Sequence, residues 1–324
     1  MILFEARASI ILYNVLKSLN TKKIFLLPLN ICPIVPAIFL KAEVSFQLVD
    51  ISNESLCIDE ERLYTLIEDK ASYGGILFLK TFGINFNAEK IYKKLRQINN
   101  DLFIIEDQCL SIPIIDFKIN STEANLVLFS TGYSKYVDLA WGGFGFMDNK
   151  FKYISSNLPF DEECLDDLIK QFQLSIENKM PLIYENTNWL GSNQILHKNF
   201  FNYSNTIKDE ISKITKHKTN LNNIYTANLP QEIILGSNYN NWRFNIMVSN
   251  KEALLKKIFQ HNLFASSHYS SLEYIYKYTK EKQNSNASKL HNNIINLFND
   301  FRFKENEALE LTDIINNFYK GNQT

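Results

Sequence analysis

Two short apolar runs in the middle of the chain, residues 102–105 and 126–129, constrain its fold most strongly. Neither run alternates with polar residues, which is typical of strands buried on both faces of a parallel sheet. Asp107 follows the first run and Ser130 ends the second. Ligands of open α/β sheets bind beyond the carboxyl ends of the strands. We therefore expect Asp107, Ser130 and the nearby Lys135 to gather at one edge of a sheet.

An acid, a hydroxyl and a lysine in this order, followed by Gly142-Gly143, match the needs of a pyridoxal-phosphate (PLP) site. A lysine bonds covalently to the cofactor aldehyde, and a carboxylate keeps the pyridine nitrogen protonated. A hydroxyl and backbone N–H groups receive the phosphate. Taken alone, the pattern also fits a solvated surface lysine that follows a strand.

The ordered motifs carry a resemblance to a known family. Ile-Ile-Glu-Asp at 104–107, Phe-Ser at 129–130, Lys135 and Gly142-Gly143 resemble the DegT/DnrJ/EryC1/StrS family of PLP-dependent sugar aminotransferases. The resemblance extends over almost the whole chain. It implies a fold type I α/β transferase, with a mostly parallel central sheet and helices on both faces. A large PLP-binding domain would span residues 1–235, and a smaller C-terminal α+β domain residues 236–324.

The resemblance also implies the roles of the site residues. Lys135 and Asp107 are the expected catalytic residues, with Lys135 as the base and Asp107 on the pyridine nitrogen. Apolar residues recur at helical spacing over residues 6–19, and the start of this helix is similar to the phosphate loop of the family. The expected cofactor-binding residues are Arg7, Ala8, Asp107, Ser130 and Lys135. Two alternatives stay open: an ordinary helix start with a surface arginine, and Asp107 as a cap.

The chain departs from the family pattern near the expected cofactor. The turn that often supplies a stacking aromatic reads Asn30-Ile31-Cys32, and Cys32 also fits a small core thiol. Leu110 stands where the family has glutamine or histidine, and Trp141 stands where it has glutamate. These differences bear on the local polarity of the site.

Strand and helix patterns alternate through the first hundred residues, which indicates a parallel, doubly wound sheet. Residues 219–236 are polar and suggest a linker. A strand at 242–248 and helices at 251–260 and 305–319 follow. We expect Arg243 to form a structural ion pair. His268 and Tyr269 fit either the substrate pocket or the packing between domains.

Composition narrows the function class. The net charge is −1, from 34 basic and 35 acidic residues, which favours neither nucleic acid nor a membrane surface as a partner. The four cysteines form no CxxC pair, so we expect reduced thiols in a cytoplasmic protein. The five histidines form no ligand motif, so we expect no metal site. No apolar run is long enough to span a membrane, so we expect a soluble protein.

The expected function is transfer of an amino group, from glutamate, to a keto group of a nucleotide-linked sugar. The resemblance implies a homodimer, an amino-acid donor as second substrate, and a role in surface polysaccharide or glycoconjugate biosynthesis. Two other functions stay open. One is a PLP enzyme acting on a non-sugar carbonyl. The other is a non-catalytic family member that serves as a binding or partner subunit.

Overall fold

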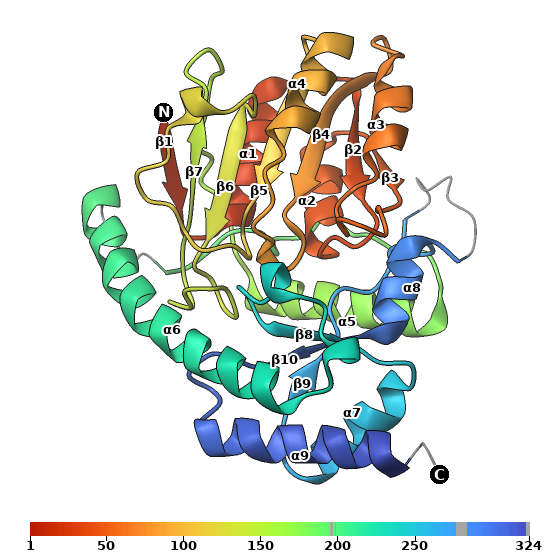
Figure 1. The fold of residues 1–324 in the computed structure, drawn as a ribbon. Helices are drawn as coiled ribbons and strands as arrows, with labels where there is room; N and C mark the ends of the chain where they lie inside the picture. Colours follow the sequence, from red (N-terminus) through yellow and green to blue (C-terminus); the bar gives the residue numbers. More distant parts are fainter. Residues whose placement is uncertain (195–196, 198, 277–283, 322–324) are drawn as a thin grey trace.

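A computed structural model of the chain describes residues 1–194, 197, 199–276 and 284–321. Within the described residues there is a large sheet with its own core and a small sheet with a second core (Figure 1). The long helix α6 (Phe200–Asn228) runs alongside both.

The large sheet has the strand order β1-β7-β6-β5-β4-β2-β3 in the described chain. Strands β6, β5, β4, β2 and β3 are parallel, whereas β7 is antiparallel to both its neighbours. The predicted mostly parallel sheet is therefore confirmed. Its strands are β1 (Ile2–Glu5), β2 (Ile24–Pro28), β3 (Phe46–Val49), β4 (Tyr73–Leu79), β5 (Phe103–Asp107), β6 (Leu126–Ser130) and β7 (Gly143–Met147).

Helices cover both faces of the large sheet, as predicted. α1 (Ala8–Leu19) and α2 (Ile34–Ala42) pack together on one face (Figure 1). α3 (Glu60–Ile67) and α4 (Glu89–Ile98) pack together on the other. From β2 the chain passes through α2 to β3, at the edge of the sheet. From β4 it passes through α4 to β5, in the opposite direction along the strand order. Because crossovers between parallel strands are right-handed, these opposite directions place the helices on opposite faces.

The small sheet has the order β8-β10-β9 and is antiparallel throughout its described strands. Its core draws on the sheet, on α6 and on the helices α7 and α9. The remaining elements are α5 (Glu162–Asn178), α6 (Phe200–Asn228), β8 (Phe244–Met247), α7 (Lys251–Gln260), β9 (Ala265–Ser266), α8 (Asn286–Asn293), β10 (Ile294–Leu297) and α9 (Glu305–Gly321).

The predicted linker at residues 219–236 is wrong over its first half, because α6 continues as a helix to Asn228. Leu221 and Tyr225 are fully buried in the second core, whereas Tyr203 and Ile207, nearer the start of the helix, are buried in the first. Two apolar side chains one helical turn apart are enough to hold the polar segment against a core. The division of the chain at residue 235 stays a prediction.

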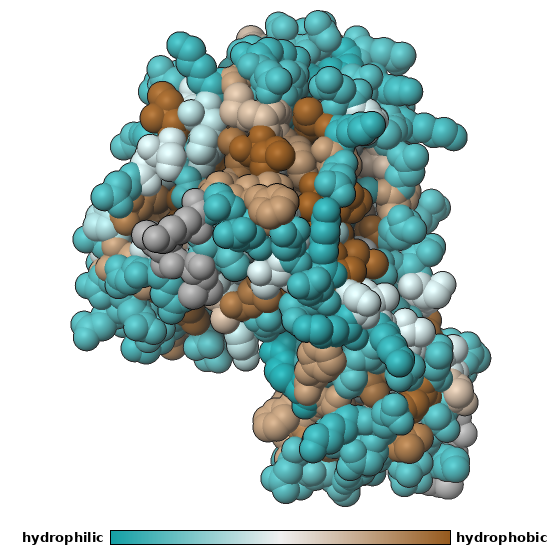
Figure 2. Space-filling model, turned by 90° about the vertical axis from the view of Figure 1, so that its left-hand side faces the viewer, coloured by the Kyte–Doolittle hydropathy of each residue, from teal (hydrophilic) through white to brown (hydrophobic). Residues whose placement is uncertain are grey.

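The outer edge of the large sheet, at β1, exposes apolar side chains. Met1 and Ile2 are exposed, and with Phe117, Ile119 and Phe146 they line a surface groove. Figure 2 looks onto this side of the molecule and shows apolar surface between the hydrophilic residues. Among the described residues, no helix has the length and apolar content needed to cross a bilayer.

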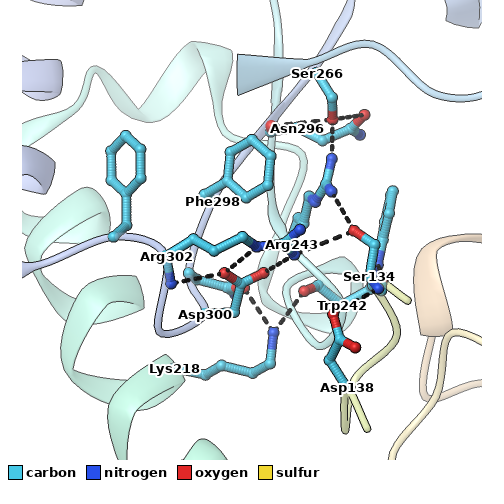
Figure 3. Close-up of polar contacts among 12 residues, drawn as sticks. Ser134, Asp138, Lys218, Trp242, Arg243, Ser266, Asn296, Phe298, Asp300 and Arg302 are labelled. Carbon is cyan, nitrogen blue, oxygen red and sulfur yellow. Dashed lines mark hydrogen bonds and ion pairs between the residues drawn. The ribbon is translucent and has the colours of Figure 1, made fainter. Parts of the chain in front are cut away.

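A buried lysine joins α6 to the small sheet. The amine of Lys218 donates to the carbonyl of Trp242 (2.7 Å; Figure 3). It also donates to Oδ1 of Asn299 (2.8 Å). Burial lowers the pKa of Lys218 to about 7, and the nearby carboxylate of Asp300 opposes this only in part. The unfolded chain, with an ordinary lysine pKa, therefore binds more protons above pH 7 than the folded chain does.

The Lys218→Met variant tests this linkage. Between about pH 7 and 10 the wild type gains stability with pH, because it folds with the lysine neutral, and the variant lacks this gain. The difference in unfolding free energy should grow in favour of the wild type, by up to about 1.4 kcal/mol per pH unit. Urea unfolding of both proteins across this range measures it. A difference that stays constant with pH would contradict the burial of a titrating amine.

Candidate active site

One cavity of about 510 Å³ brings together all the expected catalytic and cofactor-binding residues. They come from the start of α1, the ends of β5 and β6, and the loop between β6 and β7. The residues are Arg7, Ala8, Asp107, Ser130 and Lys135. The cavity lies at the carboxyl ends of the parallel strands, where ligands of such sheets bind.

Strand register explains why Asp107 and Ser130 face the same space. Asp107 pairs with Leu79 of β4 and with Leu128 of β6. Side chains alternate along a strand, so Ser130, two residues after Leu128, points to the same face as Leu128. All four residues line the cavity. Asp107 is buried, and its Oδ1 accepts the N–H of Cys109 (2.9 Å).

Lys135 lies in the loop after β6, half-buried, on the wall of the cavity. Burial by itself lowers the pKa of the Lys135 amine, but its acidic neighbours outweigh burial and raise it above the ordinary value. These neighbours are Tyr269, Cys109, Cys32 and Asp107. A raised pKa favours the ammonium form, which needs to lose a proton before the amine can act as a nucleophile.

The start of α1 is open toward the cavity. Arg7 is the N-cap in an extended conformation, and no side chain caps the first turn. Ala8 and Ser9 line the cavity there. Unsatisfied N–H groups and the helix dipole make such a start a binding site for anions.

Arg7 adds a positive charge without a carboxylate partner among the described residues. Its Nη1 donates to the carbonyl of Trp189 at 3.4 Å, and its guanidinium lies 5.8 Å from the ring centre of Phe160. Burial lowers the pKa of Arg7. A partly buried guanidinium, an uncapped helix start and the Ser130 hydroxyl together fit a phosphate, which accepts charge-assisted hydrogen bonds. The residues present therefore suit the phosphate end of PLP.

The glycine pair lets β7 approach the start of α1. The N–H of Gly142 donates to the carbonyl of Ala6 (2.8 Å), and its φ of 99° lies in the region that favours glycine. A Cβ on Gly143 would lie 2.2 Å from the backbone nitrogen of Ala8. The close contact fixes the helix start against the sheet.

Three departures from the family pattern also line the cavity: Cys32, Leu110 and Trp141. Trp141 is buried, and its indole N–H donates to the carbonyl of Gln194 (3.1 Å). Its ring meets Tyr203 of α6 edge-on at 5.2 Å. Trp141 thus takes part in the aromatic packing of α6 and makes this wall less polar than a glutamate would.

The structure separates the two alternatives left for His268 and Tyr269. Tyr269 lines the cavity and stacks on Trp242, with ring centres 6.3 Å apart. His268 is not among the cavity residues in the described chain, and burial lowers its pKa to about 4. Sequence analysis did not single out Phe160, Glu162 or the segment 191–194, which also line the cavity. Glu162 begins α5, whereas Phe160 and residues 191–194 lie in irregular segments, and none of them belongs to a motif that could have identified it.

Comparisons with known proteins place the fold. The sugar aminotransferase CalS13 of Micromonospora echinospora superposes with a TM-score of 0.69 at 12% identity, over 98% of this chain and 87% of that one. A DegT DnrJ EryC1 StrS aminotransferase of Brucella abortus superposes with a TM-score of 0.66 at 15% sequence identity, over 98% of this chain and 85% of that one. The E. coli GDP-4-keto-6-deoxy-D-mannose-3-dehydratase was solved with bound hydrated PLP. It superposes with a TM-score of 0.61 at 16% sequence identity, over 97% of this chain and 87% of that one.

By sequence, no protein-family model matches the chain and no curated protein is found to be similar. At these identities the structural likeness establishes the fold. The expected fold type I architecture, with its smaller C-terminal part, is confirmed.

The Gly143→Ala variant tests the contact that positions α1. The added methyl group overlaps backbone atoms of Ala8 that have no room to move, so we expect a loss of about 1–3 kcal/mol of stability. Gly132→Ala is the matched control, since its Cβ would meet only the Ser130 hydroxyl, at 3.5 Å. Urea unfolding of both variants gives the comparison. Equal stability of the two would show that β7 and α1 are not in close contact.

Proposed function

We propose that this protein is a PLP-dependent aminotransferase that moves an amino group onto a keto carbon of a sugar. One observation carries the proposal: Lys135 and Asp107 line the same cavity as an uncapped helix start and an arginine without a carboxylate partner among the described residues. The structural neighbours support it, because sugar aminotransferases and a PLP-containing sugar dehydratase share the fold.

When bound, PLP supplies an electron-poor ring that accepts charge from the carbon bonded to the reacting nitrogen. Asp107 would hold the pyridine nitrogen, and Arg7, Ala8 and Ser130 the phosphate. Lys135 would bond to the aldehyde carbon. Once free, its amine would take the proton from the substrate carbon bonded to the reacting nitrogen and return it to the carbon on the other side of that nitrogen, as a general base and acid. Leu79, Leu110 and Trp141 exclude water from the cavity wall.

The finer substrate assignment rests on the family resemblance. We infer a nucleotide-linked keto sugar as acceptor and glutamate as donor, for surface polysaccharide or glycoconjugate biosynthesis. Family members that dehydrate sugars have histidine in place of the lysine. Lys135 therefore favours transamination.

A homodimer in the cytoplasm completes the proposal. The exposed apolar groove at the β1 edge, with Met1, Ile2 and Phe117, supports a protein partner, because such patches are uncommon on monomers (Figure 2). The four cysteines are free thiols, which suits a reducing compartment.

One observation keeps a second function in view. Leu110 and Cys32 occupy positions where the family resemblance implies a polar group and a stacking aromatic. A chain with these changes fits a PLP enzyme for a non-sugar carbonyl, or a partner subunit without catalysis. Screening keto-sugar nucleotides as amino acceptors separates the first from the main proposal.

Covalent labelling with PLP tests the catalytic assignment. We expect purified protein treated with PLP and then borohydride to gain one pyridoxyl group, on the peptide that contains Lys135. Lys135→Ala should lose this label, and Lys150→Ala, at an exposed position far from the cavity, should keep it. Mass spectrometry of the digested protein reads the result. A wild type that takes up no label would favour the partner-subunit alternative.

Arg7→Ala tests the phosphate end of the site. Hydrogen bonds to a charged group contribute about 1.5–3 kcal/mol, so PLP affinity should fall by about ten- to a hundredfold. Lys17→Ala, which removes an exposed cation at the other end of the same helix, is the control and should bind PLP normally. Equilibrium dialysis measures both. An Arg7 variant with unchanged affinity would place the phosphate elsewhere.

A further inference from the structure

Ser134, the residue before Lys135, is tied to the rest of the molecule through its backbone and its side chain. Its φ of 63° is in the left-handed region. Its N–H donates to Oδ2 of Asp138 (2.7 Å), within the same loop. Its carbonyl accepts the indole N–H of Trp242 (2.7 Å), which lies two residues before β8 of the small sheet. The residue thus connects the lysine loop to the small sheet.

The Ser134 hydroxyl accepts from two guanidinium groups at once. Nη2 of Arg243 lies 2.7 Å from Oγ, and Nη2 of Arg302 lies 3.1 Å from it. Figure 3 shows both arginines converging on Ser134 from the small sheet and from the loop after β10. Such charge-assisted hydrogen bonds are stronger than those between neutral groups.

This arrangement carries an energetic cost that ordinary packing would avoid. Arg243 is buried between the rings of Trp242 (4.4 Å) and Phe298 (4.0 Å). Its Nε has no acceptor, and its hydrogen-bond partners are the hydroxyls of Ser134 and Ser266. In the described chain no carboxylate forms an ion pair with it, so the ion pair expected for Arg243 is wrong, and the nearby Asp300 carboxylate opposes only in part the lowering of its pKa by burial. A buried cation without an acid is unfavourable unless other contacts offset it.

Arg302 brings a second positive charge to the same hydroxyl. Its Nε donates to Oδ1 of Asp300 (2.8 Å), which neutralises one of the two arginines. Lys135 lines a second cavity, of about 220 Å³, together with Asp300 and Arg302. Any shift of these two residues would therefore reach the wall that Lys135 forms.

We propose that Ser134 is a positioning residue through which Trp242, Arg243 and Arg302 set the place of the Lys135 amine in the cavity. The small sheet thereby controls the reactivity of a group in the large one. A role for this positioning in catalysis rests on the proposed function. The effect of Ser134 on the position of the Lys135 amine does not.

The test compares two serines that both accept from Arg243. Ser134→Ala removes the hydroxyl through which both arginines contact the lysine loop and leaves the backbone contact with Trp242, whereas Ser266→Ala removes a hydroxyl on β9 that does not touch that loop. Ser134→Gly is made in parallel, because glycine tolerates the left-handed backbone and preserves folding if alanine does not. Each variant is checked for a cooperative unfolding transition.

Two readouts follow the Lys135 amine. The first is its acetylation by acetic anhydride in the protein without cofactor, followed by mass spectrometry over a range of pH. The second is reductive labelling by PLP. For both Ser134 variants we expect the acetylation midpoint to move toward that of an ordinary lysine and PLP labelling to slow by about tenfold, a change of about 1.4 kcal/mol. Ser266→Ala should stay within about twofold of the wild type.

The outcomes separate this inference from the proposed function. Equal changes in the Ser134 and Ser266 variants, or no change in either, overturn the positioning role. A wild type whose Lys135 is acetylated but never labelled by PLP overturns the proposed function. In that case the acetylation midpoints of the serine variants still decide whether Ser134 positions the lysine.

Discussion

The parallel pairing of β4, β5 and β6 is the constraint on which the rest of the molecule depends. It fixes Leu79, Asp107 and Leu128 side by side, and Ser130 two residues further on the same face. A register shift of one residue would turn Asp107 away from the cavity and into the packing of the opposite face. The apolar residues that make these strands buried therefore also determine where the carboxylate lies, and with it the orientation of any ring bound there.

The buried strands and the positions of Asp107 and Ser130 could be predicted from the sequence, because they depend on patterns among neighbouring residues. The unbroken apolar runs before Asp107 and Ser130 indicate buried parallel strands, and the carboxyl ends of such strands meet at one edge. Gly142-Gly143 belongs to the motif that carries the family resemblance, and the structure adds that this pair brings β7 close to Ala8. Patterns of this kind need no knowledge of which distant side chains touch.

The remaining features depend on contacts between distant parts of the chain. Tyr269 reaches the cavity from beyond β9, and nothing in its neighbourhood says whether it or His268 points inward. Arg243 has the sequence context of a strand residue with an acidic partner, yet it stacks between two rings and binds hydroxyls. The polar segment after residue 218 is helical because two of its side chains find a core that the sequence alone does not locate.

Helix α6 contributes buried side chains to both cores along its 29 residues, a length of roughly 44 Å. Its first half cannot stay ordered without the large sheet, nor its second half without the small one. If either core unfolds, the adjoining half of α6 loses its packing. Because helix formation is cooperative along the chain, the other half of α6 and the core that it contacts are then weakened as well. Loss of order in either core therefore weakens the packing of the other, and cleavage within this helix would destabilise both.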